Sequence, residues 1–505
     1  MELDMVTLSR WQFAITAMYH FLFVPLTLGL SILLAIFESI YVMTNNVIWR
    51  QITQFWGILF GINFAMGVST GLPMEFQFGM NWSYYSHYVG DIFGSILAIE
   101  GLMAFFLEAT FIGLFFFAWD RISKVAHLCV TWGLAMGTNL SALWILIANA
   151  WMQNPVGSEF NLDTLRMELT SFYDVVFNPV AQSKFVHTVS AGYVTGAVFV
   201  LAISAYYLLN NKHVEIAKRS MTVAASFGLA SALSVVVLGD ESGYEATQHQ
   251  KLKLAAMEGL WEQHPAPASL TLFGIPDVKA QKNHYEVKVP WLLGLIATRS
   301  FNQEIPGIKE LYELSKKRIE NGKIAYGALE KLKENKQDQN ALDTFKEYQK
   351  DLGHGLLLKK FTKDPVTATP EMVEKAAQFT IPNVGSLFWS FRIMVGLGLF
   401  FIGLFAYSFY LSAKRRLGNS QFYLRVCMLS LPLPWIAAEL GWFVAEHGRQ
   451  PWSIDGILPT FLSASNVPAS SVLISLAGFI LFYSILAVIE VKLMAKYIRR
   501  GPSYS

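Results

Sequence analysis

The chain alternates long apolar stretches with short polar connections. A hydrocarbon core of about 30 Å is crossed by roughly 20 residues of helix, so each such stretch is a candidate transmembrane helix. The pattern therefore predicts an all-α membrane protein with about nine transmembrane helices. They are expected at about 14–43, 54–79, 93–119, 125–151, 184–209, 218–239, 386–412, 422–446 and 469–495.

One polar region is much longer than the other connections, and it divides the chain into three parts. Residues 1–239 contain the first six spans, residues 240–385 form the long connection, and residues 386–505 contain the last three spans and a tail. The second half of the long connection is charged, with apolar residues at helical spacing. "HPAPAS" and "FGIPD" interrupt its first half, as turns do. We expect a small, partly helical element outside the membrane.

Lysine and arginine are unevenly distributed over the short connections. Thirteen lie on one side of the predicted membrane and four on the other. Because basic residues concentrate in cytoplasmic loops, the N-terminus and the long connection are expected outside and the C-terminus in the cytoplasm. The thirteen are Arg50, Arg121, Lys124, Lys212, Lys218, Arg219, Lys414, Arg415, Arg416, Lys492, Lys496, Arg499 and Arg500, and the four are Arg10, Arg166, Lys184 and Arg449.

Composition agrees with a membrane protein and narrows the chemistry. The chain is 53% hydrophobic and 15% charged, whereas a soluble domain carries about a quarter charged residues. The acidic N-terminus does not resemble a signal peptide, so the first span is expected to be retained. The two cysteines form no metal-binding spacing, which disfavours zinc and iron–sulfur sites. Ten histidines and seventeen methionines leave haem as the available redox cofactor.

Four polar or sulfur-bearing residues lie at a similar depth in the outer half of four predicted spans. They are His20, expected within the first two turns of its span, His187, Met394 and Glu446. Two histidines, a methionine and a glutamate in this arrangement are a plausible set of haem ligands. Each has an alternative interpretation, because an intramembrane histidine can simply bond a neighbouring helix and a methionine can fill space.

Two other histidines lie near the ends of predicted spans. His447 is the rival of Glu446 as a ligand. His127 lies at the cytoplasmic start of the fourth span, where an interfacial position is expected.

The third span carries acids that the membrane should exclude. Glu100 and Glu108 lie within it and Asp120 follows its end. The two glutamates are eight residues apart, about 12 Å along a helix and about 80° around it, so they lie on roughly the same side. A charge in the bilayer costs roughly 3 kcal/mol or more, which suggests a proton path with Ser141 of the next span as a bridge. Alternatively, both acids are protonated and only tie helices together.

Several blocks of sequence match a known family. They closely resemble subunit I of the cytochrome bd ubiquinol oxidases, in the branch with a long quinol-oxidising loop, the Q-loop. The likeness covers essentially the whole chain. The blocks are "ITAMYHFLFVPLTLGL", "MEFQFGMNWSYYSHYVGDIFG", "IEGLMAFFLEATFIGLFFFAWDR", "KFVHTVSAGYVTGA", "VVVLGDESGYE", "FRIMVG" and "GWFVAEHGRQPW".

The resemblance implies an electrogenic quinol:oxygen oxidoreductase in the bacterial inner membrane. Such an enzyme oxidises ubiquinol or menaquinol on the periplasmic side. It reduces O2 to water with cytoplasmic protons, and so generates a proton motive force without pumping. The implied partners are oxidase subunit II, small single-helix accessory subunits and the lipid bilayer, with no nucleic acid. The implied cofactors are haem b558, haem b595 and the chlorin haem d.

The resemblance also implies roles for individual residues. His187 and Met394 would be the axial ligands of haem b558. His20 would bind haem d and Glu446 haem b595, although the order of these two remains open. Arg392 and Arg449 would pair with haem propionates through the guanidinium fork, or else extend to the outer interface. Lys253, Glu258 and Asp240 would serve quinol oxidation, or else be solvated loop charges.

Two rival functions use the same residues differently. A haem-b quinone oxidoreductase that does not use oxygen would leave single ligands such as His20 unexplained. A proton-coupled transporter would use the buried glutamates, but it should have inverted repeats or broken helices, and the sequence has none that we recognise.

Overall fold

The computed structural model describes residues 4–502, and nine helical segments within them are long and apolar enough to cross a membrane. This confirms the predicted number of spans. Their helices are α1 (Met5–Phe21) with α2 (Val24–Thr44); α3 (Val47–Met80); α4 (Ser83–Ile99), the π-helix η1 (Glu100–Phe105) and α5 (Phe106–Phe117); α6 (Lys124–Trp151); α7 (Phe172–Val176) with α8 (Pro179–Leu209); α9 (Val214–His249); α14 (Pro370–Phe379) with α15 (Val384–Ala413); α16 (Gln421–Leu429) with α17 (Leu433–His447); and α19 (Ala469–Arg500).

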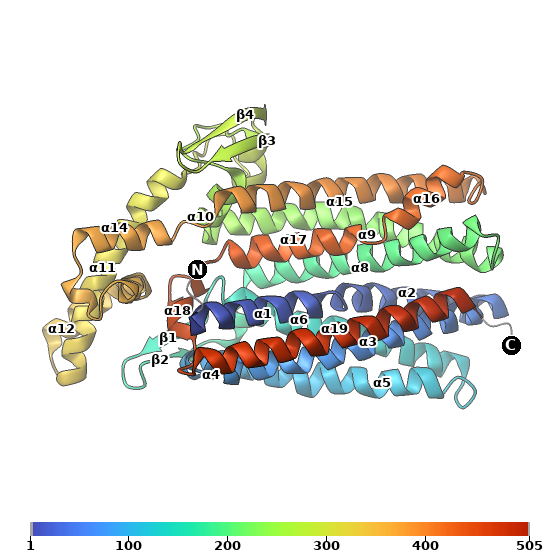
Figure 1. Cartoon of the computed structure of the whole chain (residues 1–505), viewed down its shortest axis with the longest axis horizontal. Helices are drawn as coiled ribbons and strands as arrows, with labels where there is room; N and C mark the ends of the chain where they lie inside the picture. Colours follow the sequence, from blue (N-terminus) through green and yellow to red (C-terminus); the bar gives the residue numbers. More distant parts are fainter. Residues whose placement is uncertain (1–3, 503–505) are drawn as a thin grey trace.

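The helices form one elongated bundle with different structures at its two ends (Figure 1). The first described residues and the elements of residues 250–383 lie at one end, which we call the loop end. The C-terminal residues lie at the other, which we call the tail end (Figure 1). Because successive spans alternate in direction, the connections 118–123, 210–213 and 414–420 also lie at the tail end.

The predicted spans are shorter than the helices, because helices continue beyond the apolar stretch that marks them. Helix α9 runs to His249, so Asp240 lies on a helix and not in a loop. Helix α1 begins at Met5, which places His20 fifteen residues along it and not within the first two turns as predicted. The first span is also interrupted at Leu22 and Phe23, just before Pro25 at the start of α2.

The centre of the bundle is a close contact between α2 and α8. A Cβ atom added to Gly29 would lie 2.5 Å from the carbonyl oxygen of Gly192 and 2.6 Å from Cα of Gly196. Only residues without a side chain allow two backbones to approach this closely, as is common where membrane helices pack. Large buried side chains such as Phe37, Trp56 and Phe405 belong to the main hydrophobic cluster of the bundle.

The long connection is partly helical, as predicted, but it also contains an antiparallel hairpin that was not. Strands β3 (Leu270–Asp277) and β4 (Lys282–Val289) pair beside the start of α15 (Figure 1). "FGIPD", interpreted above as an interruption, is the second half of β3. The helices here are α10 (Lys251–Glu258), η2 (Gly294–Thr298), α11 (Ile308–Glu334), α12 (Gln339–Tyr348), η3 (Gln349–Asp351), α13 (Leu352–Leu356), η4 (Leu357–Lys360) and η5 (Pro365–Thr367).

Two smaller hairpins complete the loop end. Strands β1 (Ser158–Asn161) and β2 (Arg166–Leu169) follow α6, and β5 (Trp452–Ile454) and β6 (Leu458–Pro459) follow α17. The short helix α18 (Thr460–Ser463) leads from β6 towards α19.

Candidate functional site

His187 and Met394 lie towards the loop end, on α8 and α15, and each faces a glycine. A Cβ atom at Gly239 of α9 would lie 3.1 Å from Cε1 of His187. A Cβ atom at Gly441 of α17 would lie 3.1 Å from Sδ of Met394. Nδ1 of His187 is buried and has no hydrogen-bond partner within residues 4–502, with the Val235 carbonyl nearby. A side chain at either glycine would therefore collide with the candidate ligand residue, and His187 keeps one ring nitrogen without a hydrogen-bond partner among the described residues.

His20 is oriented by a threonine on the next span. Nδ1 of His20 lies 2.9 Å from Oγ1 of Thr70, and that hydroxyl donates to the Met66 carbonyl at 2.9 Å. Nδ1 is therefore the protonated nitrogen and Nε2 has the free lone pair. A Cβ atom at Gly71 would lie 3.6 Å from this Nε2. Histidines that bind a metal through one ring nitrogen typically donate a hydrogen bond from the other nitrogen, which fixes the ring.

Glu446, at the end of α17, is the centre of a polar network at the loop end. Its Oε1 accepts from Asn149 Nδ2 at 3.1 Å and from Gln153 Nε2 at 3.2 Å, and Lys184 Nζ lies 3.8 Å away. Its Oε2 accepts from Arg449. Arg449, predicted to bind a propionate, also donates to the Ser453 carbonyl. His447 instead stacks on Phe443 with ring centroids 4.6 Å apart.

Lys253 joins this network from the long connection. It is buried on α10, and its Nζ donates to Gln153 at 3.1 Å and to Gln250 at 2.6 Å. Burial lowers the pKa of Lys253, and the nearby charge of Lys184 lowers it further. Burial likewise raises the pKa of Asp455, while the positive charge of Lys253 opposes that rise. The charges of Lys253, Lys184 and Asp455 therefore influence one another and have to be considered together.

Glu258 and Arg392 form a second cluster at the loop end. Nη2 of Arg392 lies 3.0 Å from Oε2 of Glu258, and Nη1 donates to the Met257 carbonyl at 2.7 Å. Arg392 also donates to the Thr271 carbonyl of β3. Burial raises the pKa of Glu258 to about 7, and Arg392 limits the rise. Lys253 and Glu258 lie on the same short helix, but they contact different groups.

The acids of the third span face α6. Oγ of Ser141 donates to Oε1 of Glu100 at 2.6 Å, so the predicted neighbour is in contact with the acid. Glu108 packs against Gly137, where an added Cβ atom would lie 3.0 Å from its Cγ. The π-helix at Glu100–Phe105 adds about one residue between the acids and reduces their separation from the predicted 80° to about 20°. Both glutamates are less than a tenth exposed.

Three further residues lie in surroundings that are harder to predict from the sequence. Asp120 is exposed at the tail end and its Oδ1 lies 2.7 Å from Nη2 of Arg50. Asp240 is exposed on α9, next to the ion pair between Glu241 and Arg299. His127, expected at the interface, is instead buried, with Nδ1 2.6 Å from Glu38. That expectation was wrong because the position of a residue along a span does not reveal which face of the helix is buried.

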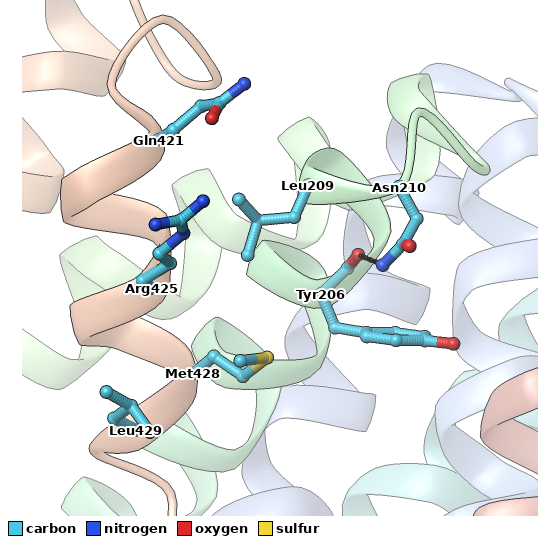
Figure 2. A pocket seen from close by; sticks show the side chains of 7 residues that line it. All are labelled: Tyr206, Leu209, Asn210, Gln421, Arg425, Met428 and Leu429. Atoms are coloured by element: carbon cyan, nitrogen blue, oxygen red, sulfur yellow. Dashed lines mark hydrogen bonds between the residues drawn. The ribbon is translucent and has the colours of Figure 1, made fainter.

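A surface cavity of about 460 Å³ lies apart from all of these residues, at the tail end between α8 and α16. Figure 2 shows the Arg425 side chain at its polar side and Met428 and Leu429 deeper along α16. None of the candidate ligands lines this cavity.

The candidate ligands are histidine, methionine and carboxylate side chains, which are all haem-iron ligands or close analogues of them. The three clear candidates, His187, Met394 and His20, each pack against a glycine, where any side chain would press on the candidate ligand. Glu446 is anionic and surrounded by cations, which suits it to a charged ligand role. The residues present therefore fit haem.

Comparison with known proteins agrees with this arrangement. Residues 8–502 match the family model described as cytochrome bd terminal oxidase subunit I. The chain is 50% identical over 500 residues to cytochrome bd-II ubiquinol oxidase subunit 1 of Escherichia coli strain K12, covering 99% of this chain and 97% of that protein. It is 37% identical over 500 residues to cytochrome bd ubiquinol oxidase subunit 1 of Bacillus subtilis strain 168, covering 99% and 94%.

The fold is also similar to a solved structure, that of bd oxidase from Geobacillus thermodenitrificans. The TM-score is 0.80 over 99% of both chains at 23% sequence identity, which supports the shared fold. The family model extends over nearly the whole chain, and two relatives align along almost their full lengths. The chain therefore belongs to the cytochrome bd terminal oxidase subunit I family.

Proposed function

We propose that this chain is the haem-carrying subunit of a quinol:oxygen oxidoreductase that generates a proton motive force without pumping protons. Its family consists of respiratory oxidases of the bacterial inner membrane, which carry haem and work with a second subunit. The relative from E. coli is named a ubiquinol oxidase, which supports quinol as the reductant. The observation that carries the proposal is the set of three ligand candidates, His187, Met394 and His20, each facing a glycine.

Three haems are assigned to these residues. His187 and Met394 would hold haem b558, and a haem held by two protein ligands would pass electrons without binding oxygen. His20 would hold haem d and Glu446 would hold haem b595. Arg392 and Arg449 lie near these sites and supply guanidinium groups for propionates. When bound, the haems carry electrons one at a time and supply the iron at which oxygen is reduced.

Quinol oxidation is assigned to the loop end, which we place in the periplasm. Glu258 takes a proton from the quinol hydroxyl, since its pKa of about 7 is suited to exchange near neutral pH. Arg392 holds that carboxylate in place at 3.0 Å. Lys253 polarises a quinol oxygen, and Asp240 lies at the root of the same region. The connections at the tail end are rich in lysine and arginine, which supports a cytoplasmic tail end.

The protons that form water are assigned to a route that enters from the tail end, opposite the quinol site. Asp120 lies at the surface of the tail end, followed inward by Glu108 and then Glu100. Ser141 extends the route by its hydrogen bond to Glu100. Waters bridge the remaining distance between the acids, because a gap of about 10 Å is too long for direct transfer.

Subunit II is the expected partner along the third span. The face of η1 and α5 away from α6 exposes Leu102, Met103, Phe106 and Phe117. Such a face suits a second membrane subunit that completes the proton route, and single-helix accessory subunits occupy other apolar faces. Ubiquinol and menaquinol remain equal candidates as the quinol.

An optical spectrum of the purified oxidase tests the proposal. A chlorin band in the far red after reduction, together with two b-type signals, is the expected result. Haem b without a chlorin band would favour a quinone oxidoreductase that does not use oxygen. A preparation that binds no haem would favour a proton-coupled transporter. Membership of an oxidase family already weighs against both alternatives.

A further inference from the structure

His127 and Glu38 form a buried acid–base pair near the tail end. Glu38 on α2 and His127 on α6 are each 1% exposed, and Nδ1 of His127 lies 2.6 Å from Oε1 of Glu38. Nε2 of the same ring lies 3.0 Å from the Phe115 carbonyl oxygen of α5. A carbonyl only accepts, so Nε2 carries a proton. A second proton must lie between Nδ1 and Oε1, because two lone pairs would otherwise face each other.

Thr131 allows the pair to accept one more proton without losing a hydrogen bond. Its hydroxyl lies 2.5 Å from Oε2 of Glu38 and 3.2 Å from the carbonyl oxygen of His127. When Oε2 is ionised, the hydroxyl donates to it. When Oε2 is protonated, the hydroxyl accepts that proton and donates to the carbonyl instead. The additional positive charge is costly in a buried site, so the extra proton is passed on and not stored.

The pair is close to the cytoplasmic surface but covered. The ring of Trp119 lies 3.9 Å from that of His127, between centroids, and the guanidinium of Arg50 lies 5.4 Å from the Trp119 ring. Arg50 in turn pairs with the exposed Asp120. One turn before His127, Lys124 bonds Asn45 at the surface. The charged groups around the pair are therefore Arg50, Asp120 and Lys124 towards the cytoplasm and Glu108 towards the interior.

The pair is aligned with Glu108 on two helices. On α5, Phe115 follows Glu108 by seven residues, about 10 Å along the axis and about 20° around it. On α6, Thr138 follows Thr131 by the same interval, and its neighbour Gly137 packs against Glu108. The hydroxyls of Thr131 and Thr138 are both buried on this face. The pair thus lies two turns closer to the tail end than Glu108, on the same line.

We propose that His127, Glu38 and Thr131 form the site that loads cytoplasmic protons onto Glu108. This inference rests on the proposed function, in which Glu108 and Glu100 carry protons inward. A proton from water at the tail end joins the pair, and the pair releases one proton through hydroxyls and water to the Glu108 carboxylate. The pair returns to its neutral state, and no electron moves in this step.

The decisive variant is Glu38→Gln in the assembled oxidase. The amide keeps the shape and both hydrogen bonds of Glu38 but has no acid proton to exchange. Proton uptake during oxygen reduction, followed with a pH-sensitive dye, should slow about tenfold or more while the haem spectrum is unchanged. Thr131→Val should slow uptake as well, and Glu38→Asp should restore part of the rate.

A matched control distinguishes a role in proton transfer from a role in holding α2 and α6 together. Nε1 of Trp132 donates to Oγ of Ser39 at 3.1 Å, so the residues next to Thr131 and Glu38 also connect α6 and α2. Trp132→Phe and Ser39→Ala remove that connection and should leave proton uptake at the rate of the unmodified enzyme. Equal slowing in these controls would overturn the inference, because any loosened contact would then suffice.

The remaining outcomes are also decisive. Uptake within about twofold of the unmodified rate in Glu38→Gln, at full haem content, would overturn the inference. If Glu38→Gln does not assemble, Thr131→Val decides by the same criterion. Glu108→Gln is measured alongside. Slowing there alone would reject the loading site and keep the proposed proton route, whereas no slowing in either variant would reject both.

Discussion

Replacing the sulfur of Met394 gives the most direct test of the proposed low-spin haem site. Met394→Leu keeps the volume nearly constant and removes the only sulfur at this position, opposite Gly441. We expect haem b558 to be lost or to change to high spin, with haem d largely retained, as seen in the reduced spectrum. His187→Ala should behave similarly. Met428→Leu, in the cavity of Figure 2, is the matched control and should leave all bands unchanged.

The ion pair between Glu258 and Arg392 predicts a pH dependence of quinol oxidation. Glu258 has a pKa raised to about 7, so its ionised form, the base, is lost as the pH falls through that value. Arg392 lowers this pKa, and Arg392→Gln should therefore move the acid limb of the rate to higher pH by about one unit or more. Arg392→Lys should move it less. The measurement is the rate of quinol oxidation across the pH range.

A control with an artificial reductant isolates the effect. Oxygen consumption driven by a reductant that bypasses the quinol site should keep its pH profile in Arg392→Gln, and it should persist in Glu258→Ala and Lys253→Ala. An acid limb that stays in place in Arg392→Gln would remove Glu258 as the base.

Single residues could be predicted from the sequence where polarity contradicted the surroundings. Glu100, Glu108 and Ser141 stand out in apolar stretches, and the contact between Glu100 and Ser141 is present. Glu38 was missed and His127 was misplaced, because both lie near the end of a span, where a polar residue is unremarkable. Their pairing depends on how α2 faces α6, which the sequence does not encode locally.

Among the single elements, the π-helix between α4 and α5 changes the relative orientation of two glutamates. A regular helix would turn Glu108 about 80° away from Glu100, whereas the wide turn aligns both with α6. A π-turn has no clear sequence signature, so the rotation could not be predicted. The hairpin β3–β4 was missed for a related reason: its glycine and proline within "FGIPD" are more typical of a turn than of a strand.

The close contact of α2 and α8 leads to a prediction about stability. A Cβ atom at Gly196 would lie 2.6 Å from backbone atoms of Gly29, so Gly196→Ala must push the helices apart. Such overpacking costs about 1–3 kcal/mol. We expect the assembled oxidase to lose its haem spectrum at a lower temperature on heating. Gly398→Ala on α15, where an added Cβ atom has no neighbour within 4 Å, should leave that temperature unchanged.

In the molecule as a whole, different groups of candidate residues lie at the two ends of the bundle. The ligand candidates, Lys253 and the Glu258–Arg392 pair gather at the loop end or near it, whereas Asp120 and the His127–Glu38 pair lie at the tail end. The number of spans and their alternating direction were predictable from apolar stretches. The similar depth of the four ligand candidates was predicted as well. The contacts of Lys253 with Gln153 and of Glu258 with Arg392 were not, because they need the long connection to fold back onto the helix ends.

This division predicts what happens when the proposed proton route between the ends is cut. Glu108→Leu removes the carboxylate between the tail end and Glu100 while leaving the loop end intact. Electrons should still arrive, so quinol should reduce haem b558 at the unmodified rate, whereas proton uptake and turnover should slow. Flow-flash kinetics after oxygen binding, with a dye that reports proton uptake, measures both steps in one sample. Ser69→Ala on α3, an exposed hydroxyl that bonds only its own helix, is a control and should change neither step. Unslowed proton uptake in Glu108→Leu at full haem content would mean that protons reach the oxygen site by a path outside the third span.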